Sequence, residues 1–307
     1  MSARRSTALW IALILVLAAA FSWWVLHPVP AGHRPHRIAR NVAPTAIPQS
    51  GSALPAPLPT ATPLSSAPSP VMTRARLAII IDDCGQWIET ERGFVALSIP
   101  VTLSVLPDVP YTKEIASEAA AGGKGVMLHL PMEPISQLNP GPGKITTEMS
   151  NAAIERQVEN DLADVPFAQG VNNHEGSKAT ADPRVMRAVA EAIVRHGNLF
   201  FVDSLTVGDS VAASSTRDAG IPTATRDVFL DNRADVAYTQ AQLRAAAAIA
   251  REHGVAIAIG HPRPSTLAAL RAIIPELQAE GIRFVLVRDL VGDSPALQPS
   301  QNAPGRR

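Results

Sequence analysis

The sequence predicts an α/β fold, namely a distorted (β/α) barrel of seven or eight mainly parallel strands. Short apolar segments alternate with longer, alanine-rich amphipathic segments across residues 74–292. The helical pattern is clearest in segment 182–197, where Val185, Val189 and Ile193 recur every four residues before a closing glycine. An open doubly wound sheet is the alternative. No glycine-rich dinucleotide-binding motif follows any expected strand, which disfavours the cofactor-binding form of that alternative.

Strands and helices are expected to follow one another through this domain. Two further alanine-rich stretches, 238–254 and 265–281, repeat the helical form and also end at glycine. The carboxyl ends of parallel strands lie at one edge of the sheet, where active sites of such folds are found. The expected strands are Leu77–Ile81, Val101–Leu106, Gly125–Leu130, Gly170–Asn172, Leu199–Val202, Pro222–Thr225, Val255–Ile259 and Arg283–Val287.

The residues before this domain indicate a membrane anchor at 1–27. Thr7–Leu26 is an almost unbroken apolar run preceded by Arg4 and Arg5, and about 20 apolar residues span a bilayer as a helix. A cleaved signal peptide is the alternative, with Ala18–Ala20 as the small-residue cleavage site. The expected location is the inner membrane with the domain in the periplasm, or a secreted protein if the segment is cleaved.

Two further segments are expected to be disordered. Residues 28–73 are rich in Pro, Ala, Ser and Thr, which is typical of an extended tether, and residues 293–307 form a polar tail. The formal net charge of zero implies no nucleic-acid partner. The single cysteine, Cys84, excludes an internal disulfide. We expect it to be a small buried residue, because neighbouring carboxylates weaken a thiol as a nucleophile.

Residues that bind metals or move protons recur where the expected strands end. Asp82 and Asp83 follow the first strand, although adjacent carboxylates repel each other and resist burial. His129, His174 and His261 lie at the ends of three other strands. Each has an ordinary explanation taken alone, such as a cap, a turn or a core histidine. Their convergence at one edge of one sheet favours a metal site, and a bound cation would relieve the repulsion between the aspartates.

This set suits metal-dependent hydrolysis of an amide or an ester. Asp83, His129 and His174 would supply three ligands to a divalent cation, for which zinc is expected, with one position open for water. Asp82 would accept the proton of that water, and His261 would protonate the leaving group. Four further residues at strand ends are expected to contact the substrate: Asn173, Asp203, Ser204 and Arg226.

Five motifs occur in order: IIIDDCG, HLPMEP, GVNNHEGS, FFVDS and IGHPRP. Together they resemble the divergent polysaccharide deacetylases, relatives of carbohydrate esterases that remove N-acetyl groups from chitin-like and peptidoglycan sugars. The resemblance covers about residues 76–291. It implies a distorted (β/α) barrel of metal-dependent ancestry. It also implies a base aspartate at Asp82, a metal aspartate at Asp83 and an acid histidine at His261.

The sequence departs from this family in two places. Better-known members bind metal through two histidines four residues apart; His174 matches the first, but Lys178 occupies the second position. A protonated lysine cannot replace that ligand, so His129 is expected to take its place. The usual arginine-proline-aromatic motif is not evident after the fourth strand, and Arg226 is the candidate for orienting Asp82.

The expected function is the removal of N-acetyl or O-acetyl groups from a cell-envelope or extracellular polysaccharide such as peptidoglycan. The alternative is a catalytically degenerate barrel that binds glycan or a protein partner. Lys178 favours this alternative, as do the few Trp and Tyr residues of the domain, which are Trp87, Tyr111 and Tyr238. A metal-free glycosidase is a third hypothesis, disfavoured because that chemistry needs a carboxylate pair rather than imidazoles.

Overall fold

The computed structural model describes residues 75–291, so the expected anchor, tether and tail lie outside the described part. Within it, strands and helices alternate as predicted. The strands are β1 (Arg76–Cys84), β2 (Thr102–Val105), β3 (Gly125–Met132), β4 (Gly170–Glu175), β5 (Phe200–Asp203), β6 (Thr223–Thr225), β7 (Val228–Phe229), β8 (Val255–Gly260) and β9 (Arg283–Val285). The helices are α2 (Ile88–Val95), α3 (Thr112–Ala121), α4 (Asn151–Asp164), α5 (Pro183–His196), α6 (Ala212–Asp218), α7 (Val236–His253) and α8 (Pro264–Ala279).

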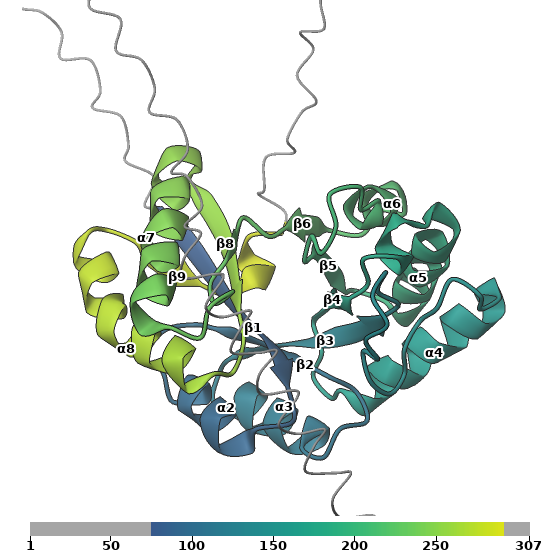
Figure 1. Ribbon diagram of the computed structural model, residues 1–307, viewed down its shortest axis with the longest axis horizontal. Helices are drawn as coiled ribbons and strands as arrows, with labels where there is room; N and C mark the ends of the chain where they lie inside the picture. Colours follow the sequence, from purple (N-terminus) through teal and green to yellow (C-terminus); the bar gives the residue numbers. More distant parts are fainter. Residues whose placement is uncertain (1–74, 292–307) are drawn as a thin grey trace, which may run out of the picture. The chain divides into compact units, whose positions relative to one another are not determined.

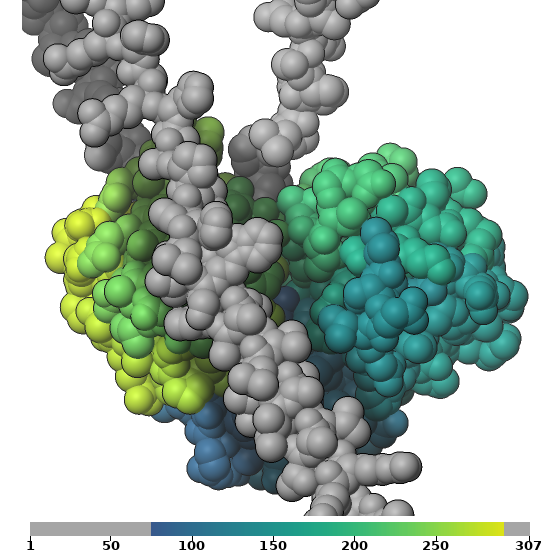
Figure 2. Space-filling view, in the orientation of Figure 1, coloured from purple at the N-terminus to yellow at the C-terminus, as the bar shows by residue number. Residues whose placement is uncertain are grey.

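The strands form one curled sheet with the helices around its outside (Figure 1). All strand pairs are parallel, in the order β6-β5-β4-β3-β2-β1-β8-β7, and β9 pairs with the first residues of β1. Figure 2 shows the same view in space-filling form, with α7 and α8 on the yellow-green side and α4 to α6 on the teal side. No helix among residues 75–291 is long and apolar enough to cross a membrane.

Side chains of each strand alternate between two apolar layers. In β1, Leu77 and Ile79 belong to the layer between the sheet and the helices, whereas Ala78 and Ile80 belong to a smaller layer inside the curled sheet. Both layers are fully buried at these positions. Asp82 continues the inward-facing series, so polar side chains begin where the inner apolar layer ends.

One continuous segment of the chain links the two edges of the curled sheet, which are formed by β6 and β7. β6 pairs with β5 at one edge, and two residues later β7 pairs with β8 at the other edge. Arg226 donates its backbone N–H to the carbonyl of Asp203, whereas Asp227 donates to the carbonyl of Ile257. The chain therefore changes partners between these two residues. Within the described residues, β6 and β7 form no ladder with each other.

The predicted α/β fold of mainly parallel strands is confirmed, whereas the expected distorted barrel of seven or eight strands is instead a curled sheet. The sheet has nine strands rather than seven or eight. The sequence does not predict β7, because a strand of two residues shows no apolar periodicity. The first strand continues to Cys84 and the fourth to Glu175, so Asp82, Asp83 and His174 lie inside their strands rather than after them. The last strand ends at Val285 instead of 287.

Helices cover the outside of the sheet (Figure 1), which differs from the doubly wound alternative, with helices on both faces. α5 begins as expected, with Asp182 capping it and Pro183 in its first turn.

Candidate active site

A bulge at the end of β1 brings two consecutive aspartates to the same place. In a regular strand, neighbouring side chains point to opposite faces. Here the pairing of β1 with β2 shifts between Ile81 and Cys84, and Asp83 adopts a φ of 58°, which is uncommon for a residue other than glycine. As a result, the carboxylates of Asp82 and Asp83 lie 3.7 and 3.2 Å from Nε2 of His129.

The buried carboxylate of Glu91 holds the turn that follows this bulge. It accepts hydrogen bonds from the backbone N–H groups of Gly85, Gln86 and Trp87 at 2.7–3.0 Å. Three consecutive N–H groups that converge on one carboxylate fix the backbone of the turn. Glu91 therefore fixes the turn that directly follows Asp83 and Cys84.

Three side chains place their donor atoms within a few ångströms of one another. Oδ1 of Asp83 lies 3.2 Å from Nε2 of His129 and 2.9 Å from Nδ1 of His174, and the two nitrogens are 3.1 Å apart. The histidines come from the adjacent strands β3 and β4, and their rings meet edge to face with centroids 4.7 Å apart. Within residues 75–291, these three residues form the group that could share a metal ion.

Asn172 connects Asp82 to His129. Its side-chain amide donates to Oδ1 of Asp82 at 2.9 Å, and its carbonyl oxygen lies 2.9 Å from Nδ1 of His129. Because a carbonyl oxygen only accepts, Nδ1 of His129 carries a proton, so a neutral His129 has its lone pair on Nε2. Nε2 is the atom that faces Asp83 and His174. This arrangement leaves Nε2 as the nitrogen through which His129 would bind a metal ion.

The two aspartates have pKa values shifted in opposite directions. Burial raises the pKa of Asp82, against the smaller opposing effect of His129 and His261. Burial also acts on Asp83, but the imidazoles of His129 and His174 together hold its pKa well below the usual range. His129 is buried too, yet the neighbouring carboxylates raise its pKa. Asp82 is thus the more basic carboxylate, and Asp83 stays ionised.

His261 approaches the same place from β8, on the other side of β1. Its Nε2 lies 3.7 Å from Oδ2 of Asp83, and its Nδ1 lies 2.8 Å from Oδ1 of Asp231. Asp231 is fully buried and also accepts hydrogen bonds from the backbone N–H of His261 and the hydroxyl of Thr266. Burial favours the neutral imidazole, but the carboxylates of Asp231 and Asp83 raise the pKa of His261. A protonated histidine in this position suits a general acid.

Three of the residues expected to contact substrate hold the loop after β5. Ser204 accepts a hydrogen bond from Asn172 at 3.1 Å and donates its backbone N–H to the side chain of Asn173 at 2.9 Å. Asp203 accepts hydrogen bonds from the backbone of Leu205 and from a serine hydroxyl further along the loop. The side chains of Asn173, Asp203 and Ser204 are all buried. Their contacts therefore hold the loop after β5 and its hydrogen bond to Asn172.

Arg226, the candidate for orienting Asp82, uses its guanidinium elsewhere. It donates to the carbonyl oxygens of Ser204 and Leu205 at 2.8 and 3.1 Å, and it lies over the ring of Phe229 at 5.0 Å. The hydrogen bond that orients Asp82 comes from Asn172 instead.

Cys84 is buried, as expected. Burial, together with the nearby carboxylates of Glu91 and Asp82, raises its pKa far above the usual range. Its thiol lies 3.2 Å from the carbonyl oxygen of Ile81. A thiol in this environment stays protonated and is a poor nucleophile.

These residues lie inside a segment that matches a known family. Residues 79–291 match the family model described as divergent polysaccharide deacetylase. The chain belongs to this family. It is 36% identical over 226 residues to an uncharacterized protein of Haemophilus influenzae, and the match covers 74% of this chain and 80% of that protein.

Two other similar proteins extend the comparison. The chain is 38% identical over 209 residues to the uncharacterized protein YibQ of Escherichia coli, covering 68% of this chain and 65% of that protein. It therefore spans slightly less than two thirds of YibQ. Its fold resembles that of an uncharacterized protein from Agrobacterium tumefaciens C58, with a TM-score of 0.68 at 23% identity, covering 74% of this chain and 92% of that one.

The donor set of this divergent polysaccharide deacetylase fits a divalent metal. Oδ1 of Asp83 is buried and accepts no hydrogen bond within the described residues, although two imidazole nitrogens lie close to it. Ligand atoms that share an ion about 2.0–2.2 Å away lie about 3–3.5 Å from one another. The three distances here, 2.9, 3.1 and 3.2 Å, agree with that spacing. Two imidazoles and one carboxylate also form a donor set typical of catalytic zinc.

Lys178 occupies the position where better-known members of the family place a second histidine. Its ammonium lies 2.7 Å from Oε1 of Glu133, and 45% of its side chain is exposed. Burial acts to raise the pKa of Glu133, but the ammonium of Lys178 and the hydrogen bonds from Thr147 lower it to about 2. Lys178 therefore pairs with Glu133, while the third donor atom at the Asp–His–His group comes from His129 in β3.

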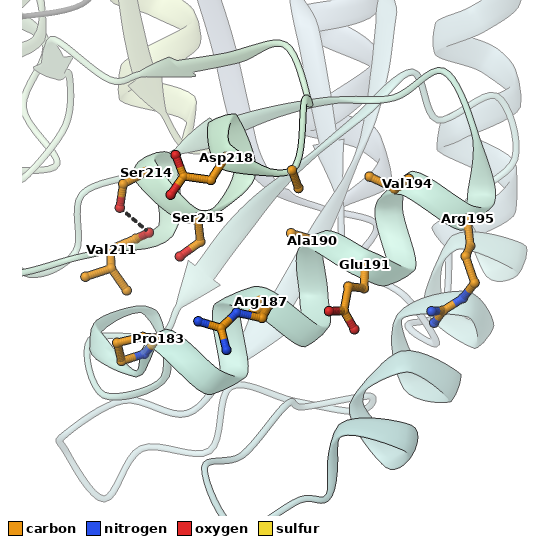
Figure 3. A pocket seen from close by; sticks show the side chains of 11 residues that line it. Pro183, Arg187, Ala190, Glu191, Val194, Arg195, Val211, Ser214, Ser215 and Asp218 are labelled. Carbon is orange, nitrogen blue, oxygen red and sulfur yellow. Dashed lines mark hydrogen bonds between the residues drawn. The ribbon is translucent and has the colours of Figure 1, made fainter.

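Two cavities adjoin the reactive side chains, and two larger ones are lined by other residues. A cavity of about 360 Å³ reaches Asp83 and His261, and one of about 180 Å³ reaches His174. The larger cavity, about 730 Å³, lies between α5 and α6. Figure 3 shows Arg187 and Glu191 of α5 below the serines of α6 across it. None of its lining residues belongs to the Asp–His–His group. The chemistry therefore places the site at the two smaller cavities.

Three supporting residues were missed by the sequence analysis: Glu91, Asn172 in its bridging role, and Asp231. Asp231 follows the apolar stretch VFL, which repeats the pattern of an apolar strand ending in aspartate seen at Asp82. That repetition was an available signal for Asp231. Glu91 and Asn172 carry no comparable signal, because their partners are defined only by the folded turn and by the register of β3 and β4.

Proposed function

We propose that this protein is a metal-dependent deacetylase that removes N-acetyl or O-acetyl groups from a cell-envelope polysaccharide. The observation that carries the proposal is the surroundings of Asp83. Two histidines lie beside one of its oxygens, the carboxylate of Asp82 is held separately by Asn172, and His261 faces its other oxygen. A ligand group, a base and an acid thus occupy different positions around one carboxylate.

The ligands and the base have distinct tasks in this proposal. Asp83, His129 and His174 would hold a divalent ion, with zinc as our choice. When bound, such an ion supplies an acidified water near neutral pH and polarises the acetyl carbonyl. Asp82 takes up the proton of the attacking water, and its raised pKa makes it a stronger base than an ordinary aspartate. Asn172 occupies Oδ1 of Asp82, which leaves Oδ2 for that proton.

His261 completes the reaction as the acid. Its Nε2 donates a proton to the departing sugar nitrogen or oxygen as the bond to the acetyl carbon breaks, giving acetate and a free amine or hydroxyl. Asp231 holds Nδ1 of His261 and stabilises the protonated ring before that transfer. Asp82 thus accepts the proton of the water, and His261 donates the proton that the leaving group needs.

The position of the protein in the cell is part of the proposal. The apolar run Thr7–Leu26 would anchor the chain in the inner membrane, and residues 28–73 would tether the domain in the periplasm. An N-acetylated glycan such as peptidoglycan is the polymer within reach of such a domain. If the segment is cleaved, the same domain acts as a secreted protein.

Release of acetate tests the proposal against the catalytically degenerate alternative. The full chain in detergent is loaded with zinc and incubated with N-acetylglucosamine oligomers and with peptidoglycan, and acetate and new free amines are measured. We expect acetate and amines in equal amounts, with the activity lost after chelation and in Asp82→Asn, which still binds zinc. A zinc-bound parent that retains the glycan but releases no acetate would establish the binding protein instead.

A further inference from the structure

An exposed tryptophan lies beside the reactive side chains. The cavity of about 360 Å³ that reaches Asp83 and His261 has Trp87 and Thr90 on another side. Trp87 is 52% exposed, although a side chain of this size is usually mostly buried. It is also the single tryptophan within residues 75–291. An exposed indole in a cavity that opens onto an acid and a ligand calls for a binding role.

The backbone of Trp87 is held firmly, so its exposure does not reflect a loose loop. Its N–H donates to Glu91 at 2.7 Å, and its carbonyl oxygen accepts from the N–H groups of Thr90 and Glu91 at 2.9 and 3.0 Å. These contacts come from the first turn of α2. An indole on a fixed backbone has only two side-chain torsions to restrict, so it binds a ligand with a small loss of conformational entropy.

The segment 262–264, Pro-Arg-Pro, contributes further residues to the lining of this cavity. Its two prolines restrict the backbone, and the N–H of Arg263 donates to the carbonyl of His261 at 2.7 Å. The guanidinium of Arg263 donates to the backbone carbonyl of Asp231. Its charge therefore has a partner within the protein, and the lining as a whole combines flat apolar surfaces with a few polar groups. Such a lining suits a pyranose ring, which has an apolar C–H face and polar edges.

We propose that this cavity is a sugar subsite in which the indole of Trp87 stacks on a pyranose ring next to the one whose acetyl group is removed. The inference rests on the proposed function and names its substrate class as an oligosaccharide or polymer. A second cavity supports an extended binding site. Gln86 lines the second cavity, of about 180 Å³, together with His174. Two cavities that each reach a residue of the Asp–His–His group leave room for more than one sugar.

Glycan binding to the metal-free protein tests this subsite separately from catalysis. The full chain in detergent is treated with chelator, and binding of N-acetylglucosamine and its tetramer is measured by titration calorimetry. The parent should bind the tetramer more tightly than the monomer. Trp87→Ala should weaken tetramer binding about tenfold, and Trp87→Phe should retain most of it. The control is Phe167→Ala, because Phe167 is 63% exposed and lies before β4, away from the carboxyl ends of the strands.

The outcomes separate the subsite from the deacetylase function. Tetramer binding that is equal in the parent and Trp87→Ala overturns the subsite, whether or not the zinc-loaded parent releases acetate. Tetramer binding that is weakened in Trp87→Ala, without acetate release by the zinc-loaded parent, supports the subsite and overturns the deacetylase. A parent that binds neither sugar overturns the subsite, and acetate release then decides the function independently.

Discussion

Histidines on the two sides of β1 are held in different ways. On the β3 side, Nδ1 of His129 faces the neutral amide of Asn172, whereas on the β8 side Nδ1 of His261 faces the carboxylate of Asp231. An amide oxygen places the proton of a neutral imidazole on Nδ1, which leaves Nε2 for a metal ion, whereas a carboxylate favours the imidazolium, which suits an acid. Both histidines have raised pKa values, but for His129 the responsible carboxylates are those whose charge a metal ion would balance. The partner of Nδ1, more than the histidine itself, assigns the role.

Removing a ligand from the β3 side should have the largest effect. His129→Ala takes away one of three donor atoms, so zinc affinity should fall by at least about 100-fold and acetate release should be abolished. Calorimetric titration of the chelator-treated full chain with zinc measures the affinity. Parent-like zinc affinity in His129→Ala would show that the third ligand lies elsewhere.

The matching change on the β8 side should separate activity from metal binding. His261→Ala should lower acetate release by about 10²–10⁴-fold, because a positioned general acid contributes this much. Zinc affinity should stay within about twofold of the parent, since His261 is not among the three donors. A large loss of zinc in His261→Ala would make His261 a ligand and remove the contrast between the two sides.

The sequence predicts the reactive residues better than it predicts what holds them. Asp83, His129 and His261 stand out because each is a polar residue in or after an apolar strand, and parallel strands bring their ends together. The bulge that turns Asp83 toward the histidines leaves no such signal, since the φ of 58° at Asp83 and the turn held by Glu91 are properties of the folded backbone. Asp231 was missed because it follows a strand of two residues that exists only through pairing with β8.

Removing the bridge on the β3 side should have an intermediate effect. Asn172→Leu keeps the side-chain size but frees both Asp82 and Nδ1 of His129, so zinc affinity should fall by about 10–100-fold, together with acetate release. Asn173→Leu is the matched control, because this neighbouring amide bonds to the last residue of β4 and to the loop after β5 rather than to the reactive residues. Equal effects of the two changes on zinc affinity would reduce Asn172 to a structural role.

Removing the carboxylate on the β8 side should move the pH profile. Asp231 raises the pKa of His261, so Asp231→Asn should lower that pKa. The acid must be protonated to act, and its activity is lost as the pH rises through its pKa. The alkaline limb of the acetate-release profile should therefore move to lower pH, with about a tenfold loss near neutrality. A loss that is uniform across the pH range would indicate a merely structural role for Asp231.

The smallest effect is expected at Lys178, which contacts neither the Asp–His–His group nor His261. Its ion pair with Glu133 is partly exposed, and such pairs contribute about 0–1 kcal/mol to stability. Lys178→Ala should therefore leave zinc affinity unchanged and lower the free energy of unfolding by less than about 1 kcal/mol in denaturant titrations. A clear change in zinc affinity would place the lysine closer to the ligand group than its pairing indicates.

The most direct test of the account follows zinc binding and acetate release in one titration. The chelator-treated full chain in detergent receives zinc in steps, and bound zinc and acetate release from N-acetylglucosamine oligomers and from peptidoglycan are measured at each step. The account predicts that activity rises in proportion to bound zinc and stops rising at one ion per chain. A folded chain that binds no zinc, or acetate release that does not depend on bound zinc, would contradict it.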